Sequence, residues 1–206
     1  MEPRWAVWAK ELAAVAQNGL TYTESAYERE RYEKVRRIAA EILAAGGGGS
    51  PETVAALWQR ERNYATPKVD VRGVIFRDDK ILLVREALDG GWTLPGGWAD
   101  PCQSPREAVE REILEESGFE ARAERLLAVY DRARQGHTPI MPFHIYKLFI
   151  LCRITGGAPA ISHETLAVDF FAEDAIPSLS LSRTLPRQIH RMFEFYRDPT
   201  LPPDFD

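Results

Sequence analysis

Three glutamates stand at spacings that bring their carboxylates together on one predicted helix. Glu112, Glu115 and Glu116 lie at i, i+3 and i+4, so a helix places their side chains on one side. Like charges this close repel one another unless a cation lies among them, and oxygen-only ligands suit magnesium, manganese or calcium. Most runs of charge are solvated surfaces. The spacing therefore indicates either a divalent-cation site or an acidic face exposed to water.

The helix that carries these glutamates has recognisable ends. Ser104 is a good N-cap, Pro105 suits the first helical position, and Glu107 completes a Ser-x-x-Glu capping box. Gly118 is the expected C-terminal stop. The apolar stripe that we expect to face a core consists of Val109, Ile113 and Leu114.

Residues 97–119 resemble the Nudix box, G-x5-E-x7-R-E-U-x-E-E-x-G-U, in which U is an apolar residue. The matching positions are Gly97, Arg111, Glu112, Ile113, Glu115, Glu116, Gly118 and Phe119. Gln103 stands where the box has its first glutamate; its amide accepts a hydrogen bond but adds no negative charge. The resemblance implies an α/β fold, an α/β/α sandwich on a mixed sheet. It also implies hydrolysis of the pyrophosphate bond in a nucleoside diphosphate linked to another moiety.

The resemblance also implies roles for the box residues. Glu112 and Glu116 are the firmest expected ligands of Mg2+ or Mn2+, with Glu115 and the carbonyl of Gly96 as further ligands. Arg111 is expected to orient a carboxylate. The bound ions would lower the pKa of the attacking water and neutralise charge on the phosphoryl oxygens. Either Glu112 or a carboxylate outside the box would then accept the proton.

Several candidates lie outside the box. Glu164, just before a predicted strand, is the candidate outside carboxylate, with a surface glutamate as the alternative. Arg132 and Lys147 are predicted to contact the substrate phosphates, because a pyrophosphate needs cationic donors; a solvated strand face is the alternative. Trp98 and Phe143 are candidates for stacking on a base; packing is an equal alternative for Trp98 and is favoured for Phe143.

Composition sets the broad class. The chain has 206 residues, 45% of them hydrophobic, a net charge of −5 and two cysteines. Such a chain can bury a sizeable core, and two cysteines are too few for a disulfide framework. Its surface as a whole is not basic, so it does not attract nucleic acid by net charge. The sequence offers no run of 18 apolar residues. Its N-terminus does not resemble a signal peptide, so we expect a cytoplasmic protein.

Residues 1–63 read as an α-helical N-terminal domain. Helices are predicted at residues 3–18, ended by Gly19, at 24–45, and from Pro51 onward; residues 46–50 form a flexible break. The apolar residues at helical spacing on the first helix are Trp5, Trp8, Leu12, Val15 and Ala16. We expect Trp5 and Trp8 to pack in a core; an interface is the second choice for them, and base stacking the last.

Residues 67–197 read as the domain that contains the box. Strands are predicted at residues 69–76 and 81–84, joined by a turn at Asp78-Asp79, and again at 123–132, 142–153 and 168–172. A last helix is predicted at residues 185–196. Residues 198–206, with two prolines after Pro199, are predicted to form a loosely held tail.

The N-terminal region and residues 64–72 are also similar to one Nudix group that hydrolyses CDP-linked compounds such as CDP-choline. In that group the small helical domain helps to build a homodimer, and the first box glutamate is often missing. Gln103, which occupies that position here, is consistent with this group. This resemblance implies a homodimer that converts CDP-choline, or a similar CDP-alcohol, to CMP and a phosphorylated alcohol.

Other functions share the same box. An ADP-ribose or nucleotide-sugar pyrophosphatase is the first alternative, because the box does not choose the base. An RNA-directed Nudix enzyme is less favoured by the acidic net charge. A non-catalytic, nucleotide-sensing domain is supported by Gln103 alone and opposed by the four charged box residues Arg111, Glu112, Glu115 and Glu116.

Overall fold

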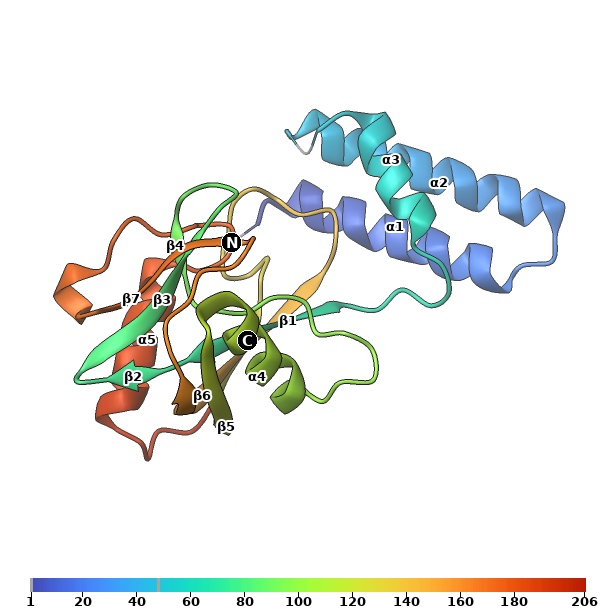
Figure 1. Ribbon diagram of the computed structural model, residues 1–206. Helices are drawn as coiled ribbons and strands as arrows, with labels where there is room; N and C mark the ends of the chain where they lie inside the picture. The colour runs from blue at the N-terminus through green and yellow to red at the C-terminus, as the bar shows by residue number, and fades with distance from the viewer. Residues whose placement is uncertain (1, 48) are drawn as a thin grey trace. The chain divides into compact units, whose positions relative to one another are not determined.

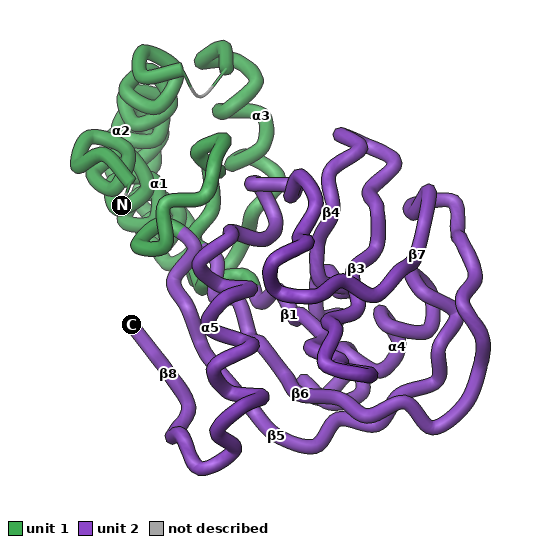
Figure 2. Tube along the Cα trace, turned by 90° about the vertical axis from the view of Figure 1, so that its left-hand side faces the viewer, with its two compact units in different colours: residues 1–68, 133–144 green, residues 69–132, 145–206 purple. Residues whose placement is uncertain are grey.

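The computed structural model describes residues 2–47 and 49–206 (Figure 1). Gly48, one residue of the predicted flexible break, lies outside the described residues. The chain divides into two compact units, residues 1–68 with 133–144 and residues 69–132 with 145–206 (Figure 2). None of the helices in the described ranges combines the length and the apolar composition needed to cross a bilayer.

The N-terminal unit contains the helices α1 (Arg4–Tyr22), α2 (Ala26–Ala45) and α3 (Pro51–Arg60). Side chains of Ser25 and Ser50 cap α2 and α3 by accepting hydrogen bonds from backbone amides. The predicted end of the first helix at Gly19 is wrong, because α1 continues to Tyr22. Gly19 instead allows the Tyr32 ring of α2 to pack against α1, where a Cβ would overlap that ring.

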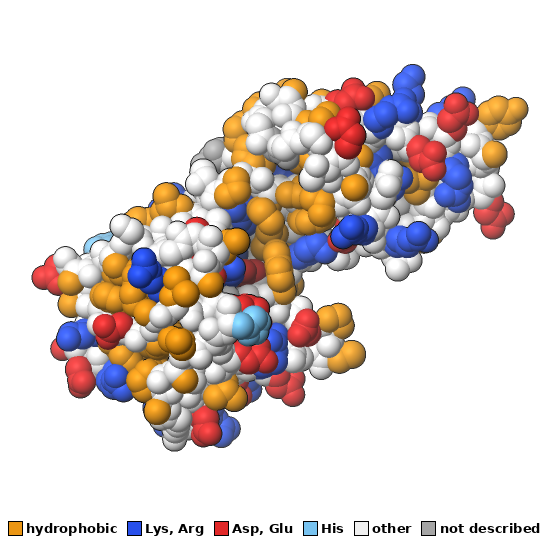
Figure 3. All heavy atoms as spheres, turned by 45° about the horizontal axis from the view of Figure 1, so that its top comes forward, with side chains coloured by type: hydrophobic (Ala, Val, Ile, Leu, Met, Phe, Trp, Pro, Cys, Tyr) orange, Lys and Arg blue, Asp and Glu red, His pale blue; other side chains and the backbone are white. Residues whose placement is uncertain are grey.

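A stripe of small residues on α1 faces the core of the N-terminal unit. The buried residues of α1 are Ala6, Ala9, Ala13 and Ala16. The predicted burial of the larger stripe is wrong for Trp8 and Val15, which are 50% and 58% exposed, and for Leu12, which is also exposed. Small side chains allow two helices to approach closely, so the larger apolar ones remain on the outside. Figure 3 shows exposed hydrophobic side chains, in orange, on the helical unit.

A segment distant in sequence belongs to the N-terminal unit. Trp58 Nε1 donates to the carbonyl of Pro142 at 2.9 Å, and the Lys68 amide donates to the carbonyl of His144 at 2.9 Å. Residues 133–144 are therefore held by the helices, whereas the predicted boundaries of 1–63 and 67–197 assign this segment to the second domain.

Two sheets form the second unit. One sheet has the strand order β1-β6-β5-β8, made of β1 (Lys68–Val74), β6 (Ile145–Gly157), β5 (Phe119–Asp131) and β8 (Asp204–Phe205). The other has the order β2-β3-β4, with β7 also paired to β3, and consists of β2 (Phe76–Arg77), β3 (Lys80–Glu86), β4 (Trp92–Thr93) and β7 (Thr165–Phe171). The first sheet is mixed, because β5 pairs antiparallel with β6 and parallel with β8.

Helices α4 (Pro105–Ser117) and α5 (Pro186–Arg197) each contribute to a separate hydrophobic core. Alternate side chains of a strand point to opposite faces. Leu82 of β3 therefore packs with Val109 and Ile113 of α4, whereas Leu83 packs with Met192 of α5. The predicted α/β/α sandwich with a mixed sheet is confirmed.

The ends of α4 are those that the sequence predicts. Ser104 and Glu107 form a capping box, and Gly118 caps the C-terminus in the left-handed region at φ 75°. Val109 and Ile113 are buried as expected. The predicted burial of Leu114 is wrong, because this side chain is exposed.

The C-terminal segment is not a loosely held tail. Asp204 and Phe205 form β8, which pairs with β5. Arg191 of α5 donates from Nε and Nη2 to the carboxylate of Asp204, each at 2.7 Å, and Tyr130 of β5 donates to the same carboxylate at 2.8 Å. These bonds to a strand and a helix contradict that part of the prediction.

Candidate active site

Strand β1 fixes the glycine loop that precedes α4. The amides of Val71 and Gly73 donate to the carbonyls of Gly97 and Pro95, each at 2.8 Å. The amide of Ala99 in turn donates to the carbonyl of Val69 at 3.0 Å. The loop therefore lies along β1 as an irregular extra strand, and its backbone is set by the sheet.

Gly96 is the point at which this loop meets α4. Its φ of 142° is a backbone conformation that L side chains rarely adopt, and a Cβ there would overlap the carbonyl oxygen of Val71. Its amide donates to Glu116 Oε2 at 2.8 Å. The last turn of α4 and the glycine loop are thus joined through one carboxylate.

Glu112 and Glu116 lie one helical turn apart, and both are buried. Glu112 lies against the backbone of Gly97. Burial raises the pKa of Glu112, opposed chiefly by the charge of Arg111. Burial also raises the pKa of Glu116 to about 7, against the charge of Arg72 and the Gly96 hydrogen bond. The structure thus holds two carboxylates where their charge is costly without a positive partner.

Arg111 is the cation that contacts the predicted glutamates. Its Nη2 lies 2.9 Å from Glu112 Oε1, and its Nη1 donates to Glu115 Oε2 at 2.6 Å. Glu115 is exposed, unlike the other two glutamates. Gln103 accepts a hydrogen bond from Arg111 Nε at 3.3 Å. Gln103, the residue that differs from the Nudix box, therefore helps to orient Arg111.

A buried ionic network lies on β1 and β6. Arg72 donates from Nε and Nη2 to both carboxylate oxygens of Asp70, at 2.8 and 2.7 Å, and Lys147 Nζ donates to Asp70 Oδ1 at 2.7 Å. Arg72 Nη1 also donates to the carbonyl of Leu94 at 3.1 Å, at the start of the glycine loop. Burial opposes the charge of Asp70, but Arg72 and Lys147 outweigh it and hold its pKa well below the usual range.

The sequence analysis missed Asp70 and Arg72 as site residues. The available signal was a pair of opposite charges two residues apart, hence on one side, in a strand that is otherwise largely apolar. Arg72 matters for the site because its charge acts on the pKa values of both Glu112 and Glu116. It is the buried cation that counterbalances the two carboxylates.

The position of Lys147 argues against its predicted contact with a phosphate. The side chain is only 2% exposed, and its donors face Asp70. Burial, together with the charge of Arg72, lowers the pKa of Lys147 to about 7. Arg132 is also buried, and its Nη2 lies 3.4 Å from the carbonyl of Ser182. Both side chains are thus buried in the structure.

Of the remaining predicted residues, Glu164 and Trp98 lie at the surface, whereas Phe143 packs in the N-terminal unit. The side chain of Glu164 is exposed and lies 3.2 Å from His163 Nε2, while its carbonyl accepts from the amide of Ala87 at the end of β3. Trp98 is exposed, beside the glycine loop. Phe143 belongs to the N-terminal unit, where it packs on the helical core.

Glu86 is a buried acid that the sequence analysis also missed. It ends β3 and lies opposite Thr165 of β7, whose hydroxyl donates to the carbonyl of Glu116 at 2.9 Å. Burial raises the pKa of Glu86, opposed first by Arg183 and then by Arg72. An acid two residues after the apolar run 81–84 was the signal available in the sequence.

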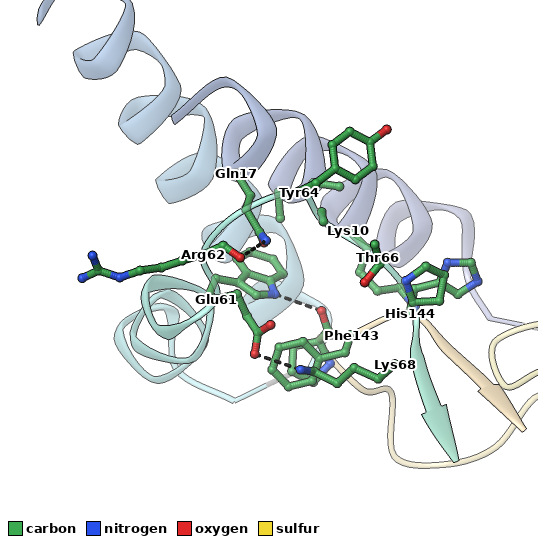
Figure 4. Close-up of a pocket in the computed structure, with 15 residues that line it drawn as sticks. Lys10, Gln17, Glu61, Arg62, Tyr64, Thr66, Lys68, Phe143 and His144 are labelled. Atoms are coloured by element: carbon green, nitrogen blue, oxygen red, sulfur yellow. Dashed lines mark hydrogen bonds and ion pairs between the residues drawn. The ribbon is translucent and has the colours of Figure 1, made fainter. Parts of the chain in front are cut away.

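A cavity of about 240 Å3 lies within the N-terminal unit (Figure 4). Its lining includes Trp58, Phe143, Lys10 and Lys68, and Lys68 Nζ donates to Glu61 at 3.0 Å. None of the residues predicted for catalysis, metal binding or phosphate contact lines this cavity. The candidate active site is therefore the cluster around Gly96, Glu112 and Glu116 in the second unit.

The donor set around Gly96 fits a hard divalent cation. As the side chains stand, no group of three or more acidic, histidine or cysteine side chains in residues 2–47 and 49–206 is arranged to hold a metal ion. Glu112 and Glu116 nevertheless present buried oxygen ligands from one helix face, and the recorded hydrogen bond to Glu116 uses only Oε2. Oxygen ligands of this kind suit Mg2+ or Mn2+.

Comparison with known families identifies the class that this fold and site define. Residues 66–194 match the model described as NUDIX domain, and residues 3–58 match the model described as UDP-X-like, N-terminal oligomerisation domain. The chain therefore belongs to the Nudix family. It is a Nudix hydrolase, a pyrophosphatase of nucleoside diphosphate-linked compounds, and enzymes of this family generally need divalent metal ions.

Known relatives match the whole chain or its hydrolase part. A protein of Bacillus subtilis (strain 168) called putative ADP-ribose pyrophosphatase YjhB is 43% identical over 100% of this chain and 99% of its own length. A crystal structure of a UDP-X diphosphatase is 34% identical to this chain, with a TM-score of 0.64, and the match covers 98% of both chains. An ADP-ribose pyrophosphatase structure from Streptococcus suis 89-1591 is 40% identical, with a TM-score of 0.62, over 68% of this chain and 100% of its own.

Proposed function

We propose that this chain hydrolyses the pyrophosphate bond of ADP-ribose or a similar nucleoside diphosphate-sugar, using divalent ions held at Glu112 and Glu116. The observation that carries this proposal is the pair of buried carboxylates one turn apart on α4, joined to the glycine loop by the Gly96–Glu116 hydrogen bond. The overall reaction adds water across the P–O–P linkage. For ADP-ribose it yields AMP and ribose 5-phosphate.

The metal, when bound, would lower the pKa of the attacking water and neutralise charge on the phosphoryl oxygens. Glu112 and Glu116 would supply carboxylate ligands, with Glu115 and the Gly96 carbonyl as further candidates. Arg111 would hold Glu112 and Glu115 in place, because it contacts both carboxylates in the structure. The positive charge of Arg72 would favour the anionic form of both buried carboxylates, because it lowers the pKa of each.

A base must take the proton of the attacking water. Glu164 is our candidate, with Glu112 as the alternative. The exposed side chain of Glu164 and its place beside the end of β3 support this choice, because the carbonyl of Glu164 bonds to Ala87, next to the buried Glu86. Trp98, exposed beside the glycine loop, is the candidate for stacking on the base of the nucleotide.

The relatives favour ADP-ribose or a UDP-linked compound over CDP-choline. Two of them are called ADP-ribose pyrophosphatases and one a UDP-X diphosphatase. The CDP-choline preference expected from the N-terminal resemblance becomes the second candidate. It retains the support of Gln103, which occupies the position of the first box glutamate.

A homodimer through the N-terminal helices is part of the proposal. The exposed apolar residues Trp8, Leu12 and Val15 follow one another at helical spacing on the outer face of α1. The family model matched by residues 3–58 is described as an oligomerisation domain. We therefore propose that a second copy of the chain covers this face.

A panel of substrates tests the function. The full-length chain is incubated with Mg2+ and, separately, ADP-ribose, UDP-glucose, CDP-choline or capped RNA, and the nucleotide products are separated by ion-exchange chromatography. We expect the highest kcat/KM for ADP-ribose or UDP-glucose, and no activity in EDTA. Fastest turnover of CDP-choline would move the preference to the second candidate.

A matched pair of variants ties any activity to the proposed site. Glu116→Gln removes one buried carboxylate, and Glu124→Gln removes an exposed one that pairs with Arg153 on the sheet. We expect Glu116→Gln to lower kcat/KM by about 100-fold or more and Glu124→Gln to leave it unchanged. Equal activity of the two variants, or tight binding without turnover of any compound, would refute the catalytic assignment.

A further inference from the structure

We propose that Arg183, positioned by the buried carboxylate of Glu86, binds the pyrophosphate group of the substrate. This inference rests on the proposed function, because it assigns a ligand contact to the same site. The phosphate-binding role predicted above for Lys147 and Arg132 is thereby assigned to a different cation, whose side chain is partly exposed.

The pairing of Arg183 with Glu86 leaves the arginine ready for a second anion. Arg183 Nε lies 2.9 Å from Glu86 Oε1; the Glu86 side chain is 3% exposed and that of Arg183 is 30% exposed. Among the described residues, the Arg183 side chain has no other hydrogen bond or ion pair, although its charge also contributes to lowering the pKa of Asp89. Both terminal nitrogens therefore keep N–H donors, and such a fork matches two oxygens of a phosphate.

The loop that carries Arg183 is fixed to β4 and to the turn before it. Trp92 exchanges backbone hydrogen bonds with Ser178 and Ser180, each at 2.9 Å, and the Ser180 hydroxyl donates to Asp89 Oδ2 at 2.7 Å. On the other side of Arg183, the buried hydroxyls of Thr184 and Thr93 lie 2.8 Å apart. The backbone of Arg183 is thus held between two anchored residues.

These anchors place the loop beside the catalytic cluster. Thr93 is followed directly by Leu94, whose carbonyl accepts from Arg72, and then by the glycine loop. Glu86 pairs across the sheet with Thr165, whose hydroxyl donates to the carbonyl of Glu116 at 2.9 Å. The next residue, Ala87, donates from its amide to the carbonyl of Glu164 at 2.9 Å. Arg183 is therefore held by an acid that adjoins the proposed metal ligand and the proposed base.

The other cations around the cluster are already engaged. Arg72 and Lys147 are buried and bind Asp70. Arg111 contacts Glu112 and Glu115, which belong to the same helix, α4. Of the cations discussed for this site, Arg183 combines exposure with unused donors, which is what contact with a pyrophosphate requires.

Binding and kinetics of three variants test the inference. The probe is ADP-ribose, UDP-glucose or CDP-choline, whichever the wild-type chain hydrolyses fastest. KM is measured with Mg2+ and Kd by calorimetry in EDTA. Arg183→Gln should raise both KM and Kd by about 10- to 100-fold, the usual effect of losing a charge-assisted hydrogen-bond pair. Arg183→Lys should recover only part of this loss, because an ammonium lacks the planar fork.

A double variant separates substrate contact from simple neutralisation of Glu86. In Arg183→Gln with Glu86→Gln no buried carboxylate is left without its cation, so thermal stability should recover while Kd stays raised. The control is Arg85→Gln, a neighbouring exposed arginine whose Nε bonds to the carbonyl of Gly90. We expect its Kd to stay within about 2-fold of wild type.

Failure of the role proposed for Arg183 and failure of the proposed function give different results. Wild-type hydrolysis with a double variant that binds as tightly as Arg85→Gln would overturn the role of Arg183 alone. Failure of the wild-type chain to hydrolyse ADP-ribose, UDP-glucose or CDP-choline would overturn the proposed function and this inference together.

Discussion

The amide of Gly96 donates to the carboxylate of Glu116 at 2.8 Å and so joins the glycine loop to the last turn of α4. A loop held by β1 and a helix held by its hydrophobic core thereby share one buried oxygen ligand. The backbone carbonyl and the carboxylate that we propose as metal ligands are positioned by the same hydrogen bond.

Gly96→Ala tests this junction. The new Cβ would overlap the Val71 carbonyl at a φ of 142°, so we expect destabilisation by about 3 kcal/mol or more and loss of about 100-fold in kcat. The matched control is Gly90→Ala, which also has a positive φ, 70°, but whose Cβ would meet only the Arg85 side chain at 3.6 Å. Chemical denaturation should show a cost of about 1 kcal/mol for that control. Equal effects of the two substitutions would contradict the close approach at Gly96.

Asp70 binds two buried cations, so its removal should be severe. Asp70→Asn leaves Arg72 and Lys147 without their counter-charge, and we expect the free energy of unfolding to fall by about 3–5 kcal/mol. Glu124→Gln breaks an exposed pair with Arg153 and should cost less than about 1 kcal/mol. Urea denaturation of both variants makes the comparison; a small loss for Asp70→Asn would show that the network contributes little to stability.

The same carboxylate predicts how stability depends on pH. The pKa of Asp70 is depressed in the folded chain relative to about 3.9 in the unfolded chain, so the unfolded state binds more protons between the two values. The stabilisation is therefore complete above about pH 5 and is lost as the pH falls through 4 toward the folded pKa. Denaturation curves from pH 3 to 6 should show a steeper fall for wild type than for Asp70→Asn. Parallel curves would contradict the assignment.

How far the sequence predicts this architecture depends on whether the determining contacts are local. The start and end of α4 follow from Ser104, Glu107 and Gly118, which act within a few residues, and the box residues are spaced within the same segment. The link between Glu86 and Arg183, in contrast, exists only because β3, β4 and the loop near Ser180 come together in the fold. No local pattern in the sequence indicates it.

The burial of helix α1 could not be predicted from the sequence either. Ala6, Ala9 and Ala13 share helical spacing, and so do Trp8, Leu12 and Val15. Larger apolar area makes the second set the natural choice for burial, but close packing of α1 against α2 selects the small residues. The spacing of apolar residues identifies the helix, but it does not show which of the two sets is buried in the core of the N-terminal unit.

The exposed stripe of α1 gives a prediction about assembly. Val15→Glu places a charge in the proposed interface, so we expect a dimer of wild type to become a monomer by light scattering at micromolar concentration. Leu88→Glu, at a highly exposed position of the second unit, should leave the dimer intact. A Val15→Glu variant of the same mass as wild type would place the interface elsewhere.

Binding of Mn2+ to the full-length chain, measured by electron paramagnetic resonance, tests whether Glu112 and Glu116 hold a divalent cation. We expect saturable binding that Glu112→Gln with Glu116→Gln weakens by about 100-fold or more, while Glu124→Gln, which changes an exposed residue of β5, does not alter it. Mn2+ affinity that is the same in wild type and in the double variant would contradict a metal site built on these two carboxylates.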